Sequence, residues 1–184
     1  MDPQDLSRVV VVGTSAAGKT TFARQLSSIL NSPHVELDAL FWEANWTQAT
    51  DEVFRERVKV ATRGDRWVVD GNYRRQVSDL FLPRATAVVW LNLGFRTVFS
   101  RAVGRTFRRL WTREELWAGN REGLRNLLDP EGIPLWVIRT FHRRRRAYAK
   151  LFGDSGPKRP YRVIELRTTR EVKRFLEKVC LDFS

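Results

Sequence analysis

The residue types with the clearest chemical meaning stand at positions 13–20, which read Gly-Thr-Ser-Ala-Ala-Gly-Lys-Thr. They fit the phosphate-binding pattern G-x-x-x-x-G-K-[ST], in which glycines let successive backbone N–H groups point at an anion. An apolar run at 9–12 precedes the motif and a helical pattern at 18–30 follows it, which is the strand–loop–helix setting that the motif requires. The alternative is a glycine-containing turn that fits by chance. The complete match favours a nucleoside triphosphate site.

Each position of this loop has an expected role. Lys19 should reach the β- and γ-phosphates, and the hydroxyl of Thr20 should bind Mg²⁺. The predicted cofactors are therefore ATP and Mg²⁺. The residues of the loop expected to contact the nucleotide are Gly13, Ser15, Ala16, Ala17, Gly18, Lys19, Thr20 and Thr21.

A second group, Asp70-Gly71-Asn72-Tyr73-Arg74, follows the apolar residues 67–69. Ligands of open α/β sheets bind outside the carboxyl ends of the strands, so a site is expected here. Asp70 could orient water on Mg²⁺, and Arg74 could hold an anionic acceptor through two parallel hydrogen bonds. The alternative is an ordinary Asp-Gly turn. The position after a buried strand favours the site.

Asp38 follows a short predicted strand at 34–37 and should face the same crevice. A carboxylate there can take the proton of an acceptor hydroxyl within hydrogen-bond reach. The alternative is an N-cap for a helical segment at 39–42. Trp42 and Trp46 lie just beyond and could stack on a nucleobase, although aromatic residues at helical spacing more often pack in a core.

Composition limits the class of protein. The 184 residues carry 33 Lys and Arg against 21 Asp and Glu, a net charge of +12, which favours anionic partners such as nucleotides, nucleic acid or an acidic membrane surface. One domain over 1–184 is expected, with no apolar run of membrane-spanning length and no signal peptide at its polar start. The single cysteine, Cys180, fits a reducing cytoplasm. His34 and His142 are isolated, so no zinc or iron site is expected.

Apolar, β-branched runs alternate with helical patterns along the chain. Strands are predicted at 9–12, 34–37, 67–70, 85–93 and 161–166. Helices are predicted at 18–30, 50–63, 95–110, 134–151 and 169–179. This alternation predicts an α/β fold with a parallel sheet covered by helices on both faces.

Several motifs resemble those of known families. The D-G-x-x-R of residues 70–74 resembles the D-G-F-P-R of adenylate kinases and related nucleoside monophosphate kinases, and residues 101–105 resemble the R-x-x-G-R before their lid. Over nearly the whole chain, the sequence is similar to small bacterial proteins described as adenylate-kinase-like or DNA topology modulation (FlaR-like) proteins. The signatures that carry this similarity are Leu37-Asp38-Ala39-Leu40-Phe41-Trp42, Trp67-Val68-Val69-Asp70-Gly71-Asn72-Tyr73 and Leu116-Trp117-Ala118-Gly119-Asn120-Arg121-Glu122. The chain departs from true adenylate kinases in lacking F-P after strand three.

The resemblance implies a three-layer phosphate-loop fold of the nucleoside monophosphate kinase type, with a five-stranded parallel sheet in the order 2-3-1-4-5. It also implies a lid-like helical segment around 106–130. Arg101 and Arg105 would contact the nucleotide phosphates, and Arg113 would close over the transferring group. For the run 143–146, a solvated helix face is the preferred interpretation, because four consecutive residues point all round a helix; contact with a nucleic-acid backbone is the alternative.

The implied function is ATP- and Mg²⁺-dependent phosphoryl transfer to a nucleotide-like or other small anionic acceptor, phosphorylated or hydroxyl-bearing. The expected catalytic residues are Lys19, Asp38, Arg74, Arg105 and Arg113. Two alternatives stay open: a nucleic-acid-associated, ATP-binding regulator, and a polynucleotide 5′-hydroxyl kinase. The oligomeric state is left open.

Overall fold

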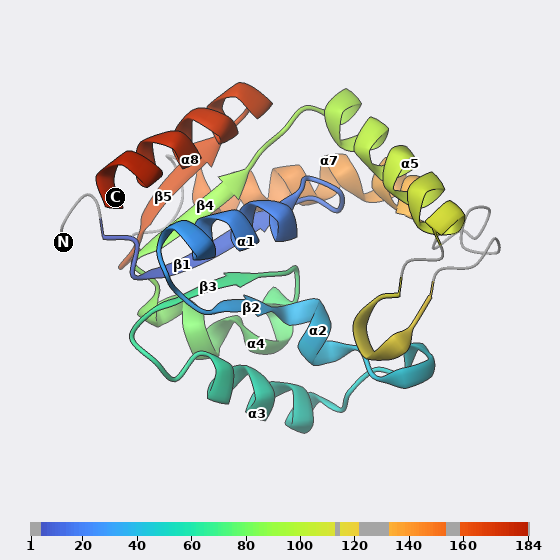
Figure 1. Ribbon diagram of the computed structural model, residues 1–184, viewed down its shortest axis with the longest axis horizontal. Helices are drawn as coiled ribbons and strands as arrows, with labels where there is room; N and C mark the ends of the chain where they lie inside the picture. The colour runs from blue at the N-terminus through green and yellow to red at the C-terminus, as the bar shows by residue number, and fades with distance from the viewer. Residues whose placement is uncertain (1–4, 113–114, 122–132, 154–158, 184) are drawn as a thin grey trace.

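A computed structural model describes residues 5–112, 115–121, 133–153 and 159–183. Its strands are β1 (Arg8–Gly13), β2 (His34–Glu36), β3 (Trp67–Asp70), β4 (Ala87–Leu91) and β5 (Arg162–Leu166). All neighbouring pairs are parallel, in the order β2-β3-β1-β4-β5 (Figure 1). The predicted fold class and strand order are therefore confirmed.

Helices cover both faces of this sheet (Figure 1). They are α1 (Lys19–Ile29), α2 (Leu37–Phe41), α3 (Asp51–Ala61), α4 (Arg74–Phe81), α5 (Phe95–Thr112), α7 (Ile133–Phe152) and α8 (Thr169–Phe183). Short 3-10 turns in the described residues are η1 (Ala44–Trp46), η2 (Leu82–Arg84) and η3 (Trp117–Gly119). None of the helices in the described parts of the chain is long and apolar enough to cross a membrane.

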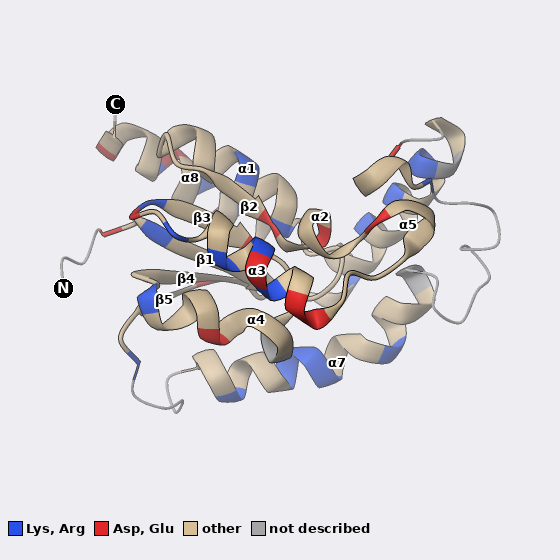
Figure 2. Ribbon diagram, turned by 90° about the horizontal axis from the view of Figure 1, so that it is seen from below, with Lys and Arg blue, Asp and Glu red and all other residues tan. Residues whose placement is uncertain are grey.

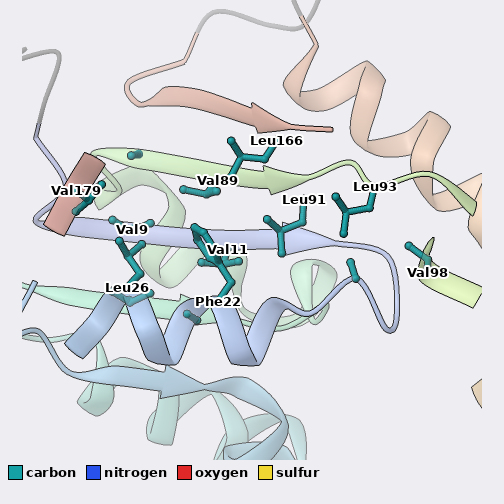
Figure 3. Packing of buried hydrophobic residues seen from close by; sticks show 14 of the residues in the cluster. Val9, Val11, Phe22, Leu26, Val89, Leu91, Leu93, Val98, Leu166 and Val179 are labelled. Atoms are coloured by element: carbon teal, nitrogen blue, oxygen red, sulfur yellow. The ribbon is translucent and has the colours of Figure 1, made fainter. Parts of the chain in front are cut away.

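The central strand β1 contributes side chains to two hydrophobic cores, because successive side chains of a strand point to opposite faces of the sheet. Val9 and Val11 pack with Phe22 and Leu26 of α1 on one face, where β4, α8 and the start of α5 also contribute (Figure 3). Val10 and Val12 pack on the other face, against α3, α4 and the end of α7. A strand buried on both faces reads as an uninterrupted run of valines, which is why it was recognisable in the sequence.

Two short helices lie beside the crevice: α4 was not predicted, and α2 entered the sequence analysis only as the alternative helical segment at 39–42. The chain leaves the edge strand β2 after three residues and turns directly into α2, while α4 follows β3. The two turns approach each other closely at Gly71, whose φ is 144° and where a Cβ would lie 2.6 Å from Leu37 Cβ. Only glycine combines this backbone angle with this contact, so Gly71 lets the residues after β2 and β3 share one site.

The predicted lid segment is described only in part. Residues 106–112 continue α5 as one helix, and 115–121 contain η3 and an isolated bridge between Glu115 and Arg121. Residues 113–114 and 122–132 lie outside the described chain. The single domain and the lid therefore stay predictions.

Candidate active site

The phosphate-binding motif forms the loop between β1 and α1. The N–H of Ala17 donates to the Thr14 carbonyl at 3.2 Å, and Gly18 adopts a left-handed conformation, with φ 91°, immediately before α1. The loop curls round Lys19, whose Nζ donates to the same Thr14 carbonyl at 3.2 Å. The predicted contact residues 15–21 all line one cleft. Gly13 does not; it lies behind the loop, where a Cβ would come within 2.9 Å of the Leu91 carbonyl oxygen.

Lys19 is perturbed by its surroundings. Its residue surface is half-buried, but its ammonium group is largely withdrawn from water, and this burial lowers its pKa to about 8. The carboxylates of Asp38 and Asp70 oppose the shift, whereas Arg144 and Arg105 add to it. The amine thus sits among two acids and two guanidinium groups. A bound phosphate would favour its charged form.

Thr20 and Asp70, the two residues expected to bind Mg²⁺, are in direct contact. The Thr20 hydroxyl donates to Asp70 Oδ2 at 2.7 Å, and His34 Nε2 lies 2.8 Å from Asp70 Oδ1. Asp70 is buried, so both partners offset the cost of removing its carboxylate from water. Two hard oxygen donors suit Mg²⁺, which binds proteins through one or two carboxylates and takes its other ligands from phosphate and water. Within the described part of the chain, no group of three or more Asp, Glu, His or Cys residues could hold a metal ion.

Asp38 lies on the opposite side of the cleft from α5 and α7. It occupies the first turn of α2, not its N-cap, which is Glu36. The Tyr73 hydroxyl donates to Asp38 Oδ1 at 2.7 Å. Burial, followed by the charge of Asp38, raises the pKa of Tyr73, so the phenol stays protonated and keeps donating. Tyr73 was not predicted as a site residue; its hydroxyl orients Asp38.

The helix α5 brings two predicted arginines to the loop. Arg101 Nη1 donates to the Ala17 carbonyl at 2.9 Å, and Arg105, one turn later, lines the same cleft. The other two predicted arginines are not placed: Arg113 and the side chain of Arg74 lie outside the described residues.

The interpretation of residues 143–146 as a solvated face holds for the exposed Arg143 but is wrong for the half-buried Arg144. Arg143 and Arg144 line the cleft, and Arg144 Nη1 lies 3.3 Å from Ser15 Oγ with its guanidinium 5.4 Å from the Trp136 ring centroid. Arg145 instead donates to Asn92 Oδ1 at 2.7 Å, and Arg146 to its own helix. Four consecutive residues do point apart, but that argument does not prevent one of them from entering a site.

Asn72 connects the lysine and the new arginine. In the amide orientation that satisfies both of its ends, Oδ1 accepts from Lys19 Nζ at 3.3 Å and from Arg144 Nη1 at 2.9 Å. Its Nδ2 then donates to the Gly13 carbonyl at 2.9 Å. The residue therefore ties the end of β3 to the phosphate loop and to α7.

Three tryptophans form a wall beside Asp38. Trp42 and Trp46 meet edge to face with ring centroids 5.5 Å apart, and Trp46 meets Trp117 likewise at 6.5 Å. All three are half-buried and line the cleft. Trp42 also contacts the buried Phe41 ring at 5.1 Å. The two interpretations offered for Trp42, core packing and ligand contact, are therefore compatible.

The segment 115–121, which carries Trp117 of this wall, lies next to η1, which carries Trp46 (Figure 1). Asn120 is buried there: its Oδ1 accepts from the Trp46 N–H and its Nδ2 donates to the Glu43 carbonyl, both at 2.8 Å. Trp46 and Ala118 have positive φ angles of 56° and 54°, a backbone conformation that residues other than glycine rarely adopt. Such strain persists where the surrounding structure holds it, and it concentrates at binding sites.

The whole cleft has a volume of about 2320 Å³. Pockets for a single small molecule usually enclose roughly 300–1,000 Å³. The described walls therefore leave room for a nucleotide at the loop and a second ligand beside Asp38.

Comparison with known proteins gives similarity at the level of fold. No family model and no curated protein matches the chain. A shikimate kinase from Bacteroides thetaiotaomicron aligns at 18% identity over 94% of this chain and 95% of its own, with a TM-score of 0.54. A shikimate kinase from Aquifex aeolicus aligns at 15% identity over 95% and 94%, with a TM-score of 0.52. A gluconokinase from Sinorhizobium meliloti aligns at 16% over 96% and 95%, with a TM-score of 0.50. The chain therefore has the α/β fold of small phosphate-loop kinases.

Proposed function

We propose that the protein is a kinase that transfers the γ-phosphoryl group of ATP, with Mg²⁺, to a hydroxyl group of a small acceptor. One observation carries the proposal: the loop with Lys19 and the Asp38–Tyr73 pair face one cleft, close enough for Asp38 to act on the pKa of Lys19. A protein that only binds ATP needs the loop but has no need of an oriented carboxylate opposite it.

The donor side would act by positioning and electrostatics. The loop amides and Lys19 would hold the β- and γ-phosphates, while Arg101, Arg105 and Arg144 would neutralise charge on the transferring group. Thr20 and Asp70 would hold Mg²⁺, which supplies charge neutralisation between the phosphates. In phosphoryl transfer the protein mainly positions the reactants and stabilises charge, and this arrangement of cations is suited to both tasks.

On the acceptor side, Asp38 would accept the hydroxyl proton. The acceptor oxygen forms a bond to the γ-phosphorus as the bond from that phosphorus to the β,γ-bridging oxygen breaks, and the electron pair stays on ADP. The released proton passes to Asp38 and then to water. Tyr73 holds one carboxylate oxygen in place, which leaves the second oxygen to receive the proton.

Membership of the adenylate-kinase-like or DNA topology modulation group is part of the proposal, as are the single domain, the lid around 106–130, and roles for Arg113 and Arg74. The names of the similar structures, shikimate kinase and gluconokinase, support phosphorylation of a small hydroxyl compound. A nucleic-acid role is not proposed, because Arg144 and Arg145 are engaged within the molecule.

The test begins with ATP binding by calorimetry. Lys19→Ala should lower affinity for Mg·ATP at least about ten-fold, because the cation inserted among the phosphates is lost. Lys59→Ala, an exposed lysine of α3, is the matched control and should bind normally. A metabolite panel with γ-labelled ATP should then yield a labelled small molecule. ATP hydrolysis stimulated by an oligonucleotide, with no labelled metabolite, would refute the kinase and favour the regulator.

A further inference from the structure

Asn72, the second residue after β3, lies where the phosphate loop and α7 meet. Lys and Arg residues occur at several points along α7 (Figure 2). One of them, Arg144, precedes Tyr148 by one helical turn, so the two side chains leave the same face of the helix. Both contact the side chain of Asn72, and so does Lys19 of the phosphate loop. Asn72 therefore connects the charged groups of two elements.

Two acceptors determine which way the amide of Asn72 points. Its Nδ2 donates to the Gly13 carbonyl at 2.9 Å and to the Tyr148 hydroxyl at 2.8 Å. An amide nitrogen has two hydrogens to donate, and both are used by these contacts. The Oδ1 atom is therefore turned toward Lys19 and Arg144.

Two cations converge on this one oxygen. Lys19 Nζ lies 3.3 Å and Arg144 Nη1 lies 2.9 Å from Asn72 Oδ1. Like charges this close repel each other, and the partial negative charge of the amide oxygen between them offsets the repulsion. Arg144 is also held by the Ser15 hydroxyl at 3.3 Å and by the Trp136 ring, whose centroid is 5.4 Å away.

A phosphate oxygen would bind the same two cations more tightly than the amide oxygen does. Hydrogen bonds between ionised partners are roughly twice as strong as those between neutral groups. Lys19 belongs to the phosphate-binding motif, whose lysine reaches the β- and γ-phosphates. Arg144 shares an acceptor atom with Lys19 and would reach the same part of a nucleotide. Donors held at that point need little rearrangement when charge develops on the transferring group.

We infer that Asn72 is a positioning residue: its amide oxygen holds Arg144 beside Lys19, so that both cations meet the γ-phosphate of ATP. Without this oxygen, repulsion from the lysine would move the guanidinium group away. Asn72 acts through the two cations and takes no part in bond formation. The inference rests on the proposed kinase function, because it takes the transferring phosphoryl group as the anion that the cations meet.

The test compares the dissociation constants of Mg·ADP and of Mg²⁺ with a non-hydrolysable ATP analogue, both measured by calorimetry. The ratio of the two constants reports the contribution of the γ-phosphate. Asn72→Ala and Arg144→Ala should each lower this ratio about five-fold. Because both residues act through one contact, the double variant should also lose about five-fold, whereas independent effects would multiply to about twenty-five-fold. Arg146→Ala, an exposed arginine of the same helix, is the matched control and should keep the wild-type ratio.

A smaller change tests the same contact without removing the asparagine. Tyr148→Phe keeps the ring that packs against Phe152 and removes the hydroxyl that accepts from Asn72. The amide is then less firmly oriented, and the ratio should fall about two- to three-fold. Tyr161→Phe is the matched control, because the Tyr161 ring also contacts Phe152 but does not line the cleft.

Three results would overturn the inference: an unchanged ratio in Asn72→Ala, an equal loss of affinity for ADP and the ATP analogue, or multiplied losses in the double variant. If Asn72→Ala does not fold, an unchanged ratio in Tyr148→Phe overturns it instead. The kinase proposal is tested separately, by the labelled product of the metabolite panel. If no product forms while the ratios change as expected, the kinase proposal fails, and the role of Asn72 in placing the two cations at the γ-phosphate stands.

Discussion

The donor and acceptor halves of the cleft are built in different ways. The donor half consists of one contiguous loop and faces of the long helices α5 and α7, and its charge is positive. The acceptor half consists of short elements, α2, η1 and η3, joined by contacts between residues far apart in sequence. A general anion cradle needs only backbone amides and cations. Selection of one acceptor needs a surface that matches its shape, and here that surface is formed by residues far apart in the sequence.

The largest expected effect lies where the two halves meet, at Asp38. Asp38→Asn should lower kcat about 10³-fold, within the usual contribution of a general base, while ATP affinity stays unchanged. Tyr73→Phe removes only the orienting hydroxyl and should cost about ten-fold. Asp182→Asn, on the exposed end of α8, is the control.

Single-turnover kinetics on an acceptor found in the metabolite panel, together with ATP calorimetry, measure both quantities. A loss confined to ATP affinity would place Asp38 in the donor half and break the division proposed here.

The next effect tests the donor half. Arg144→Ala should lower kcat/KM about 100-fold, the typical cost of removing one preorganised donor from a transition state. Arg144→Lys should recover little, because Nη1 reaches Ser15 and Asn72 while the planar guanidinium lies over the Trp136 ring, and an ammonium cannot make both kinds of contact at once. Arg146→Ala, two residues along the same helix, is the control. If Arg144→Ala and Arg146→Ala lower kcat/KM equally, α7 contributes only a general positive potential and Arg144 makes no specific contact with the transferring group.

A pH profile tests Lys19, whose pKa of about 8 is depressed mainly by burial. Below that value the side chain is charged and binds phosphate; above it, the amine is neutral and binding requires uptake of a proton. Affinity for Mg·ATP should therefore fall about ten-fold between pH 7 and pH 9. Lys19→Arg keeps its charge throughout this range and should flatten the profile. If the affinity of the wild-type protein for Mg·ATP does not change between pH 7 and pH 9, the pKa of Lys19 is not depressed.

Much of the donor half could be predicted from sequence because its signals are local. The loop is contiguous, and the valine run before it identifies the strand. Helical spacing gave only a partial signal for α7: Arg144 and Arg145 both lie three or four residues from the inward-packed Phe141 and Tyr148, and of the two only Arg144 lines the cleft. The missed signal was that an arginine of a basic run can share the apolar face of its helix.

The acceptor half was less predictable because its residues gain meaning only in space. Glu36 ends a three-residue strand and belongs to no motif. Asn120 acts through backbone groups at 43 and 46, more than seventy residues away. The turns that lead into α2 and α4 approach each other closely at Leu37 and Gly71, and neither local sequence indicates this approach.

The smallest expected effect tests whether the segment 115–121 shapes the acceptor wall. Asn120→Ala removes the hydrogen bonds to the Trp46 N–H and the Glu43 carbonyl, and leaving such buried groups unpaired costs about 1–3 kcal/mol of folding free energy. Denaturant unfolding measures that loss. Because the tryptophan wall would loosen while the phosphate loop is untouched, KM for the acceptor should rise about three- to five-fold and the dissociation constant for Mg·ATP should hold. Asn45→Ala, exposed in the same turn, separates general loosening of η1 from loss of the link to Asn120. If Asn120→Ala weakens ATP and acceptor binding equally, the segment supports the whole cleft, and the two halves are less independent than their construction indicates.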